Sequence, residues 1–574
     1  MHNPAIAHVW VNEFLLELRD LGVKAVAIAP GSRSTVLASR AAEIFGRDVT
    51  IHFDERGLGF FALGAAKASG APACVITTSG TAVANLLPAV IEAHYAEIPL
   101  IVISADRPPE LLNCGTNQTI HQPDIFGVYP QWSCEIPCAS GEISIDTIRD
   151  WARKAVRKSI APGHGPVHIN WMFREPFFSS PHTDEVIPVL PRPAAPPIQP
   201  AILPRVEANM AALHQIVRDS KRGLCLIGEL SSEQETAATV DIIRALGWTT
   251  FADSLSQLRQ RADLPYLVNY ADLALLAPIP AELEPDTVIH LGGRVTSKRL
   301  TTLLAPARGR TILSISNRQR PFNPLGGIDK SIHASLSYVA QETLERPTFQ
   351  DSQLLDCMRR RDQAIEATLP QHLATSAIDP ITEPALLALL SSAVPSSHLL
   401  FLGNSMPIRD FEMFAQRRST PPQTLANRGA SGIDGVLSTA LGAASRISQS
   451  GTLIVGDLSF LHDLNALALA KLRTSPFVVV VINNDGGGIF SLLPVSGTSS
   501  FERCFGTPHG VTFEGIVGSF GLPYVNPANI NELLDAYAVA ITRSCATVIE
   551  VRTSREENAA LHHTIHKAIA SVLK

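Results

Sequence analysis

The sequence predicts an α/β protein of three consecutive doubly wound parallel-sheet domains, and three observations lead to this fold class. Short β-branched apolar runs alternate with helical patterns along the chain, which is typical of parallel βαβ units. A proline-rich stretch and a later polar stretch separate three such regions. The length of 574 residues is enough for roughly three or four domains of ~150 residues.

The first predicted domain covers residues 1–180. Its opening segment Ala5–Leu21 is amphipathic, and Gly22 is suited to end a helix there. Four apolar runs are predicted as buried strands, namely Val23–Ala29, Val49–Phe53, Ala73–Thr77 and Leu100–Ser104. Residues 181–204 are rich in proline, which interrupts helices and central strands, so this stretch is predicted to be an extended linker.

The second predicted domain, residues 205–345, has a Rossmann-like pattern. Ser232 and Glu235 have the spacing of a capping box at the start of a helix. The predicted strands are Gly223–Ile227, Thr287–Leu291 and Thr311–Ile315. No G-x-G-x-x-G follows any of these strands, so a dinucleotide site is not indicated.

Residues 346–382 are predicted to be a linker that contains a helix. The charged run Arg359–Asp362 within it is expected on the solvated surface. The third predicted domain then covers residues 383–574.

The composition excludes several classes of partner. The net charge of −6 gives no electrostatic footprint for nucleic acid or an anionic membrane. No apolar stretch approaches the ~18 residues of a membrane-spanning helix. The eight cysteines form no C-x-x-C pair, which indicates reduced thiols in a cytoplasmic protein.

Two polar motifs follow neighbouring predicted strands in the third domain. Gly456-Asp457-Leu458-Ser459 follows the apolar run Thr452–Val455. Asn483-Asn484-Asp485-Gly486 follows the run Phe477–Ile482. The segment His462–Lys471 between them is predicted as the crossover helix of a βαβ unit.

Asp457 and Asn484 should converge, because the ends of neighbouring parallel strands lie at one edge of a sheet. A carboxylate and a carboxamide make a hard-oxygen site suited to Mg²⁺, which fills its other positions with waters and phosphate oxygens. The sequence therefore indicates a metal site that holds a diphosphate. The alternative is that Asp457 only caps a helix and that Asn483–Gly486 is only a turn.

This pair of motifs resembles the G-D-(G/x)-S…N-N signature of thiamine-diphosphate enzymes, with Leu458 where many members have a second glycine. Three successive α/β domains also fit the decarboxylases and carboligases of that superfamily. The resemblance implies thiamine diphosphate as the cofactor and Mg²⁺ or Mn²⁺ as the metal. It implies metal ligands at Asp457, Asn484 and the Gly486 carbonyl, and further cofactor contacts from Gly456, Ser459 and Ile489.

The cofactor's aminopyrimidine ring needs a carboxyl group that shares a proton with a ring nitrogen. Glu55 follows the strand Val49–Phe53 and precedes the glycine-rich helix Gly57–Gly70. Burial there would raise its pKa, as a proton-donating carboxyl requires. The alternative is a carboxylate stabilised by the start of a helix. The resemblance implies that Glu55 activates the cofactor and that Ile433 supports its bent form.

Arginines recur beside glycine, serine or proline at predicted strand ends. Arginine is suited to clamp a carboxylate because its planar fork gives two parallel bonds. A single such residue is more often a surface ion pair, but five clusters indicate substrates with several carboxylates. The clusters contain Arg33, Arg107, Lys298-Arg299, Arg409 and Arg428.

Six motifs together resemble the 2-succinyl-5-enolpyruvyl-6-hydroxy-3-cyclohexene-1-carboxylate synthases, the thiamine-diphosphate enzymes of menaquinone and phylloquinone synthesis. The motifs are Ala29–Ser34, Ser104–Leu111, Gly115–Ile120, Gly403–Asp410, Ala426–Gly435 and Gly488–Pro494. In this family 2-oxoglutarate is decarboxylated, and the succinyl carbanion adds to isochorismate in a conjugate, Stetter-like addition.

The family resemblance also implies residue roles. Catalytic roles fall to Glu55, Arg33, Arg107, Gln118, Arg409 and Arg428. Substrate contacts come from Ser32, Arg33, Arg107, Asn117, Gln118, Lys298, Arg299, Ser405, Arg409 and Arg428, with an apolar wall of Ile489, Phe490 and Leu493.

The resemblance further implies a homodimer whose active sites combine the first domain of one chain with the third domain of the other. Whether dimers pair into tetramers stays open. The alternative function is another thiamine-diphosphate 2-oxoacid decarboxylase or carboligase, although a small pyruvate pocket conflicts with the arginines. His562 and His566 lack the glutamate of an H-E-x-x-H zinc motif and are expected on a solvated helix.

Overall fold

The structure is a computed structural model that describes residues 3–179, 188, 190–192, 207–344, 352–373, 379–447 and 450–574. Most of the predicted linker 181–204 lies outside these residues. The chain forms two compact units. Unit 1 contains residues 1–202, 427–447 and 463–469, and unit 2 contains residues 203–426, 448–462 and 470–574.

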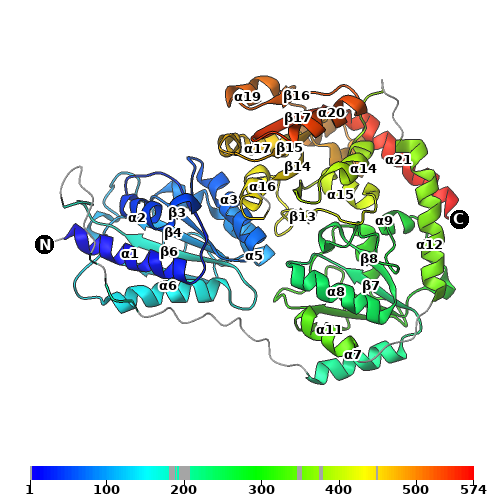
Figure 1. Cartoon of the computed structure of the whole chain (residues 1–574), viewed down its shortest axis with the longest axis horizontal. Helices are drawn as coiled ribbons and strands as arrows, with labels where there is room; N and C mark the ends of the chain where they lie inside the picture. The colour runs from blue at the N-terminus through cyan, green and yellow to red at the C-terminus, as the bar shows by residue number, and fades with distance from the viewer. Residues whose placement is uncertain are drawn as a thin grey trace. The chain divides into compact units, whose positions relative to one another are not determined.

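Three parallel β-sheets confirm the predicted fold class (Figure 1). The sheet of unit 1 has the strand order β2-β1-β3-β4-β6-β5. Its strands are β1 (Ala25–Ile28), β2 (Val49–Ile51), β3 (Ala73–Thr77), β4 (Leu100–Asp106), β5 (Trp132–Ile136) and β6 (Pro166–Met172). The helices around it are α1 (Pro4–Asp20), α2 (Thr35–Phe45), α3 (Glu55–Ser69), α4 (Thr81–Ala84), α5 (Leu87–Ala96), α6 (Ile145–Ser159) and α16 (Val436–Ala444).

Unit 2 contains the two other sheets. The first has the order β11-β10-β9-β7-β8, built from β7 (Gly223–Ile227), β8 (Thr249–Ala252), β9 (Thr287–Leu291), β10 (Thr311–Ser316) and β11 (Lys330–His333). Its helices are α7 (Glu207–Asp219), α8 (Glu233–Leu246), α9 (Ala271–Ala274), α10 (Lys298–Thr301) and α11 (Leu336–Leu344). Ser232 caps α8 as predicted, because its hydroxyl accepts the Glu235 backbone N–H at 3.1 Å.

The second sheet of unit 2 has the order β13-β12-β14-β15-β17-β16. Its strands are β12 (Leu399–Leu402), β13 (Gln423–Leu425), β14 (Gly451–Gly456), β15 (Phe477–Asn483), β16 (Tyr524–Val525) and β17 (Ala546–Arg552). The remaining helices are α12 (Ser352–Thr368), α13 (Pro370–Leu373), α14 (Glu383–Ala393), α15 (Met406–Phe414), α17 (Asp457–His462), α18 (Leu467–Lys471), α19 (Glu514–Ser519), α20 (Ile530–Ala540) and α21 (Arg555–Val572). Among the described helices, none is long and apolar enough to cross a membrane.

Glycines let α3 and α16 approach very closely within unit 1. A Cβ atom on Gly64 would lie 2.0 Å from the Thr439 carbonyl oxygen, and one on Gly442 would lie 2.0 Å from the Phe61 carbonyl oxygen. Backbone blocks each position, so no side chain can be added without moving a helix.

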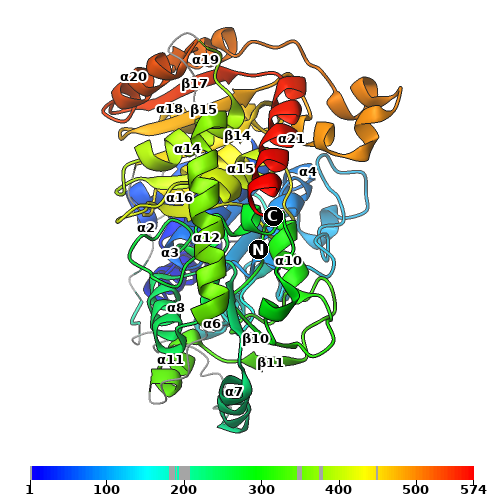
Figure 2. The same ribbon diagram turned by 90° about the vertical axis from the view of Figure 1, so that its right-hand side faces the viewer.

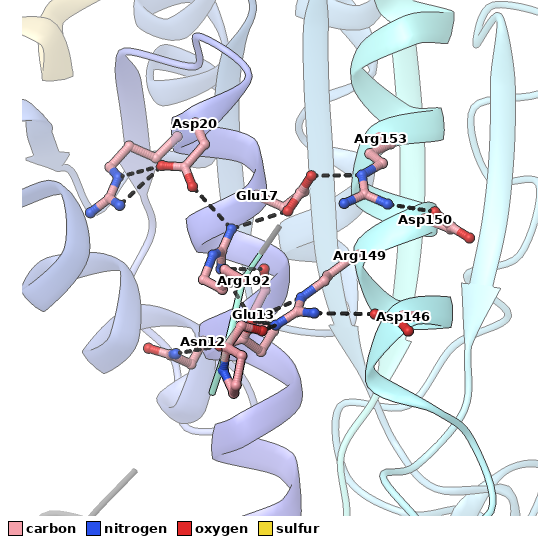
Figure 3. Close-up of polar contacts among 11 residues, drawn as sticks. Asn12, Glu13, Glu17, Asp20, Asp146, Arg149, Asp150, Arg153 and Arg192 are labelled. Atoms are coloured by element: carbon pink, nitrogen blue, oxygen red, sulfur yellow. Dashed lines mark hydrogen bonds and ion pairs between the residues drawn. The ribbon is translucent and has the colours of Figure 1, made fainter. Parts of the chain in front are cut away.

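A network of buried carboxylates and arginines joins α1 to α6 in unit 1 (Figure 3). The Glu13 carboxylate accepts two hydrogen bonds from Arg149, at 3.0 and 2.7 Å. Arg153 donates to Glu17 at 2.7 Å. Arg192, in the described part of the proline-rich stretch, donates to Glu17 and Asp20 at 3.0 Å each. The network thereby fastens this part of the proline-rich stretch to α1.

The crossover between β14 and β15 differs from the prediction of one helix over His462–Lys471. It consists of α17 and α18 with a break at Asp463, whose φ is −120°. The buried Asp463 carboxylate accepts the Ser438 backbone N–H at 2.7 Å and thus caps the start of α16. This second task of Asp463 explains the break.

Figure 2 shows α12 and α21 side by side. The prediction that the whole run Arg359–Asp362 is solvated was wrong, because Arg361 and Asp362 are buried. Asp362 accepts the backbone N–H groups of Asn269 and Tyr270 at 2.9 and 2.7 Å. These contacts satisfy backbone groups at the start of α9, which a charge run in the sequence cannot reveal.

Candidate active site

The strand-end motifs meet in unit 2 as predicted. β14 and β15 are adjacent parallel strands with Gly456 opposite Ile482. Asp457 then begins α17, and the Gly486 N–H donates to Asp457 Oδ2 at 2.9 Å. Gly486 has φ 136°, and a Cβ atom there would lie 1.9 Å from the Gly506 carbonyl oxygen. Only glycine fits this turn. A helix does start at Asp457, and a turn does follow β15. Both features therefore occur within the predicted site and do not compete with it.

The oxygens at these strand ends suit a hard cation. Asp457 is buried, and burial outweighs its hydrogen bonds from Gly486, His509 and Leu458 to raise its pKa. Asn484 donates from Nδ2 to Glu383 at 2.8 Å. Within the described part of the chain, Asn484 Oδ1 is buried without a hydrogen-bond partner. A cation would supply the missing partner of Oδ1 and stabilise the buried carboxylate.

The described residues contain no group of three or more His, Cys, Asp or Glu that could hold a metal ion. The site at Asp457 has a different donor set, with one carboxylate and one carboxamide. It leaves positions for phosphate oxygens and waters, which is the usual arrangement for Mg²⁺. Gly456 lies half-buried at the same strand end, and Ser459 is buried in α17.

Glu55 is the first residue of α3 in unit 1, where Asp54 caps the helix. Glu55 is half-buried in the single chain. The reason is that β2, which precedes it, is an edge strand. Ile51 and Phe53 beside it are 57% and 60% exposed, so this end of unit 1 presents an apolar surface.

Arg107 and Gln118 meet at Ser79 in unit 1, and Arg33 lies close enough to Arg107 to act on its charge while donating to the Phe173 carbonyl at 3.0 Å and to Glu175 at 2.8 Å. Arg107 donates to the Ser79 hydroxyl, and Gln118 Nε2 donates to the Ser79 carbonyl at 2.9 Å. Burial, followed by the charge of Arg33, lowers the pKa of Arg107. Two buried guanidinium groups close enough to interact suit an anion, and the exposed Glu175 carboxylate already pairs with Arg33 here. Ser32 and Asn117, which directly precede Arg33 and Gln118 in the sequence, are exposed.

The loop that carries Arg428 and Ile433 also belongs to unit 1. The buried Glu92 carboxylate accepts the backbone N–H groups of Gly429 and Ala430 at 2.7 and 2.6 Å. Arg428 is half-buried, and the Ile433 side chain is 42% exposed. Glu92 therefore fixes the backbone between these two predicted site residues.

The other predicted substrate residues lie in unit 2. Ser405 precedes α15 with φ 71°, and its carbonyl accepts a hydrogen bond of 2.6 Å from Arg409. Lys298 is exposed at the start of α10, whereas Arg299 pairs with the buried Asp272. Ile489 and Phe490 are half-buried and Leu493 is 46% exposed. Arg299 thus already has a protein carboxylate partner.

Three profiles of thiamine-diphosphate enzymes match the chain. The profile for the thiamine pyrophosphate enzyme, N-terminal TPP binding domain, matches residues 11–127. The middle domain of thiamine pyrophosphate enzymes matches residues 203–402. The C-terminal TPP binding domain matches residues 410–551. Because two of the three are cofactor-binding domains, the chain is a thiamine-diphosphate-dependent enzyme.

Full-length relatives decide the family. The 2-succinyl-5-enolpyruvyl-6-hydroxy-3-cyclohexene-1-carboxylate synthase of Rubrobacter xylanophilus is 38% identical, with 99% of each chain covered. The synthase of the same name from Chlorobium phaeobacteroides is 36% identical, with 100% of this chain and 99% of the relative covered. The chain belongs to this synthase family.

Solved structures confirm the fold of the synthase chain. Benzoylformate decarboxylase from Polynucleobacter necessarius has a TM-score of 0.73 at 16% identity, covering 95% of this chain and 99% of that one. A putative thiamin diphosphate-dependent enzyme from Mycobacterium smegmatis has a TM-score of 0.67 at 18% identity, with the same coverage. These two likenesses concern the fold alone.

Sequence reasoning missed His509, which lies against Asp457 in this synthase. The Val511 N–H donates to His509 Nδ1 at 3.0 Å, so the ring proton of a neutral imidazole is on Nε2. Nε2 then donates to Asp457 Oδ2 at 3.2 Å. His509 stands outside both strand-end motifs, so no local pattern could have indicated it.

Sequence reasoning also missed a buried cluster in which the carboxyl groups of Glu383 and Asp410 lie with His562. Burial, followed by the charge of Asp410, raises the pKa of Glu383 to about 7. His562 Nε2 lies 3.1 Å from Asp410 Oδ1. Although burial lowers the pKa of His562, the Asp410 and Glu383 carboxylates raise it overall.

The expectation that His562 lies on a solvated helix was wrong, because its side chain is only 1% exposed. The buried residues of α21 are Asn558, His562, Ile565 and Ile569, which recur at helical spacing. This apolar face was a usable signal for the burial of His562, but its acidic partners were not visible in the sequence.

Proposed function

We propose that the chain catalyses thiamine-diphosphate-dependent decarboxylation of 2-oxoglutarate and conjugate addition of the resulting succinyl group to isochorismate. The products are 2-succinyl-5-enolpyruvyl-6-hydroxy-3-cyclohexene-1-carboxylate and CO₂. Full-length similarity to the synthases of that name supports this reaction. The reaction is a step of menaquinone or phylloquinone synthesis.

The observation that carries the substrate assignment is the pair of buried guanidinium groups, Arg33 and Arg107. They lie close enough for the charge of one to lower the pKa of the other. The Glu175 and Asp106 carboxylates offset part of this repulsion, and a substrate carboxylate would offset more of it while accepting charge-assisted hydrogen bonds. Gln118, which is held at the same Ser79, would donate beside them. Ser32, Asn117, Arg409 and Arg428 are proposed as further polar contacts.

We propose Mg²⁺ or Mn²⁺ as the metal, held by Asp457, Asn484 and the Gly486 carbonyl. The unpartnered Asn484 Oδ1 and the buried Asp457 carboxylate support this donor set. The bound cofactor supplies the stabilised acyl carbanion on which the carbon–carbon bond depends. Glu55 would share a proton with its pyrimidine ring, and Ile433 would support its bent form.

An assay with purified protein, thiamine diphosphate, Mg²⁺, 2-oxoglutarate and isochorismate tests the reaction. We expect isochorismate absorbance to disappear only when 2-oxoglutarate is present. Pyruvate in place of 2-oxoglutarate separates the rival decarboxylase or carboligase function. Turnover of pyruvate at a comparable rate would contradict the proposed substrate.

Replacing Arg33 by alanine tests the anion site. A lost charge-assisted bond corresponds to ~1.5–3 kcal/mol, so the KM of one dicarboxylate substrate should rise roughly tenfold to a hundredfold, while cofactor affinity stays unchanged. Arg174→Ala is the matched control, because Arg174 forms its bidentate pair with the exposed Glu110. If the Arg33→Ala and Arg174→Ala variants had equal KM values, Arg33 would not belong to the substrate site.

We also propose a homodimer with two shared sites, each using Glu55 of one chain and Asp457 of the other. Ile51 and Phe53, which precede Glu55 in the sequence, and Ile433, which also belongs to unit 1, are exposed apolar side chains and support a covering partner. Mixing equal amounts of Glu55→Gln and Asp457→Asn chains should restore about one quarter of wild-type activity, because half of the random dimers carry one intact site. No recovery would mean that each site is built within one chain.

We further propose domain limits at residues 180, 204, 345 and 382, and a cytoplasmic location. All eight cysteines lie in the described residues and are free of disulfides, which supports a reducing compartment.

A further inference from the structure

The proposed metal site depends on which end of the Asn484 carboxamide faces the cation. The group carries a donor, Nδ2, and an acceptor, Oδ1, at the same distance from its Cγ atom. Only Oδ1 can coordinate a cation, and a half-turn of the amide would present an N–H group instead. Something must therefore hold Asn484 in the productive orientation.

Glu383, at the start of α14, is placed to do this. Its Oε1 accepts the Asn484 Nδ2–H at 2.8 Å and the Thr553 hydroxyl at 3.0 Å. Glu383 is buried, so no water competes for this oxygen. Because Oε1 receives two donors, any proton on this carboxyl group belongs on Oε2, and Oε1 remains an acceptor. Asn484 can satisfy it only with Nδ2.

The surroundings of Glu383 favour an acceptor that stays in place. In the described part of the chain, Glu383 Oε2 has no hydrogen-bond partner. The Asp410 carboxylate acts electrostatically on Glu383, and His562 pairs with Asp410 at 3.1 Å. With no donor at Oε2 in that part of the chain, the hydrogen bonds that hold this carboxylate are the two at Oε1, from Asn484 and Thr553.

We propose that Glu383 is a positioning residue for the metal site: its Oε1 fixes the Asn484 carboxamide so that Oδ1 faces the divalent cation. This role rests on the proposed function, because it presupposes a metal held by Asp457 and Asn484. Glu383 itself touches neither substrate nor cofactor in this role. It acts through the orientation of a ligand, as outer-shell partners of metal ligands do elsewhere.

Three substitutions of Glu383 separate orientation from charge. Glu383→Gln keeps an acceptor at the same reach and removes the charge. Glu383→Asp keeps the charge but withdraws the acceptor by one methylene. Glu383→Leu removes both. If Glu383 orients Asn484, the glutamine variant should bind Mg²⁺ within about threefold of wild type, and the other two should lose roughly tenfold to a hundredfold in affinity.

Calorimetric titration of metal-free protein with Mg²⁺ in the presence of thiamine diphosphate measures these affinities without turnover. Thr553→Val is the matched control, because it removes the other donor to Glu383 Oε1 and leaves the bond from Asn484. It should retain Mg²⁺ affinity within about threefold, since it does not alter the amide orientation. Thermal unfolding of each variant reports folding, and if the leucine variant does not fold, the glutamine and aspartate variants still decide.

The outcomes are distinct. A glutamine variant as weak as the leucine variant would show that the charge of Glu383 matters and its acceptor geometry does not. An aspartate variant equal to wild type, or a Thr553→Val loss equal to the leucine loss, would also overturn the positioning role. Absence of Mg²⁺ binding in wild type would instead refute the proposed metal site, which Asn484→Ala tests independently.

Discussion

Two buried charge clusters in this molecule are built in opposite ways. In unit 1, the carboxylates of Glu13 and Glu17 are each about 1% exposed, and arginines surround them (Figure 3). In unit 2, Glu383 and Asp410 are equally buried. Within the described residues, the one ion pair to these two carboxylates comes from His562, which pairs with Asp410. The first cluster is fully compensated, and the second is not.

The difference separates a structural cluster from one beside a functional site. Arginine remains charged in proteins, so the cationic partners of Glu13 and Glu17 keep their charge. Histidine can lose its proton, and a carboxyl group with a pKa near 7 can gain one, so the second cluster adjusts its charge. Burying such an adjustable cluster costs stability. The cluster also supplies the Glu383 carboxylate that accepts the hydrogen bond from Asn484 at the proposed metal site.

The largest expected effect is the loss of Arg149 from the compensated cluster. Arg149→Met leaves the Glu13 carboxylate with fewer donors in a buried site, and the free energy of unfolding of unit 1 should fall by about 3–5 kcal/mol. Urea unfolding measures this. Arg174→Met, which removes an exposed pair, should cost less than ~1 kcal/mol. Equal losses in both variants would erase the contrast between buried and exposed pairs.

The second cluster should make the metal-free protein less stable as pH rises. Glu383 has a folded pKa raised from 4.5 to about 7, so its contribution is complete below about pH 4.5 and lost by about pH 7, amounting to ~3 kcal/mol. His562 has the same sign, because its raised pKa favours the folded state below 6.5. Unfolding midpoints between pH 5 and 8 test this, and Glu383→Gln should flatten the dependence. A steeper curve in that variant would contradict the assignment.

A smaller effect is expected from Arg192, which joins the compensated cluster from its more exposed side. Arg192→Gln removes bonds of 3.0 Å to Glu17 and Asp20, but Arg153 still serves Glu17. The expected loss in unfolding free energy is about 1–2 kcal/mol. Limited proteolysis near Arg192 should become faster in this variant than in wild type. Unchanged stability and proteolysis would mean that Arg192 does not fasten this stretch.

The smallest effect is expected from Asp410→Asn. The change removes repulsion of Glu383, and His562 can release its proton instead of remaining as an unpaired charge. The free energy of unfolding at pH 7 should therefore change by less than ~1 kcal/mol, in contrast to Arg149→Met. NMR titration should show a lower pKa for His562 in the variant. A loss of several kcal/mol would show that the two clusters are alike.

Strands and strand-end motifs were predictable because their signals are local. The predicted strands Ala73–Thr77, Gly223–Ile227 and Thr287–Leu291 have the bounds of β3, β7 and β9. The motifs at Asp457 and Asn484 follow adjacent strands, so topology alone brought them together.

The partners of Asn484 and of the buried Glu13 were not predictable, because they come from distant parts of the chain. Glu383 lies 101 residues from Asn484, and Arg192 lies 179 residues from Glu13. Neither pair has a spacing that helices or strands impose. The degree of burial of Glu55 could not be predicted either, since the sequence does not show that β2 lies at a sheet edge.

The close packing of α3 against α16 has a consequence for synthesis on the ribosome. Unit 1 begins with residues 1–202 and takes its last residues, 463–469, from far along the chain. At ~5–20 residues per second, roughly 15–50 s pass between the two. During this time, the glycine-lined face of α3 awaits a helix that has not yet been translated. A nascent chain halted before residue 427 should therefore engage chaperones more than one released after residue 469.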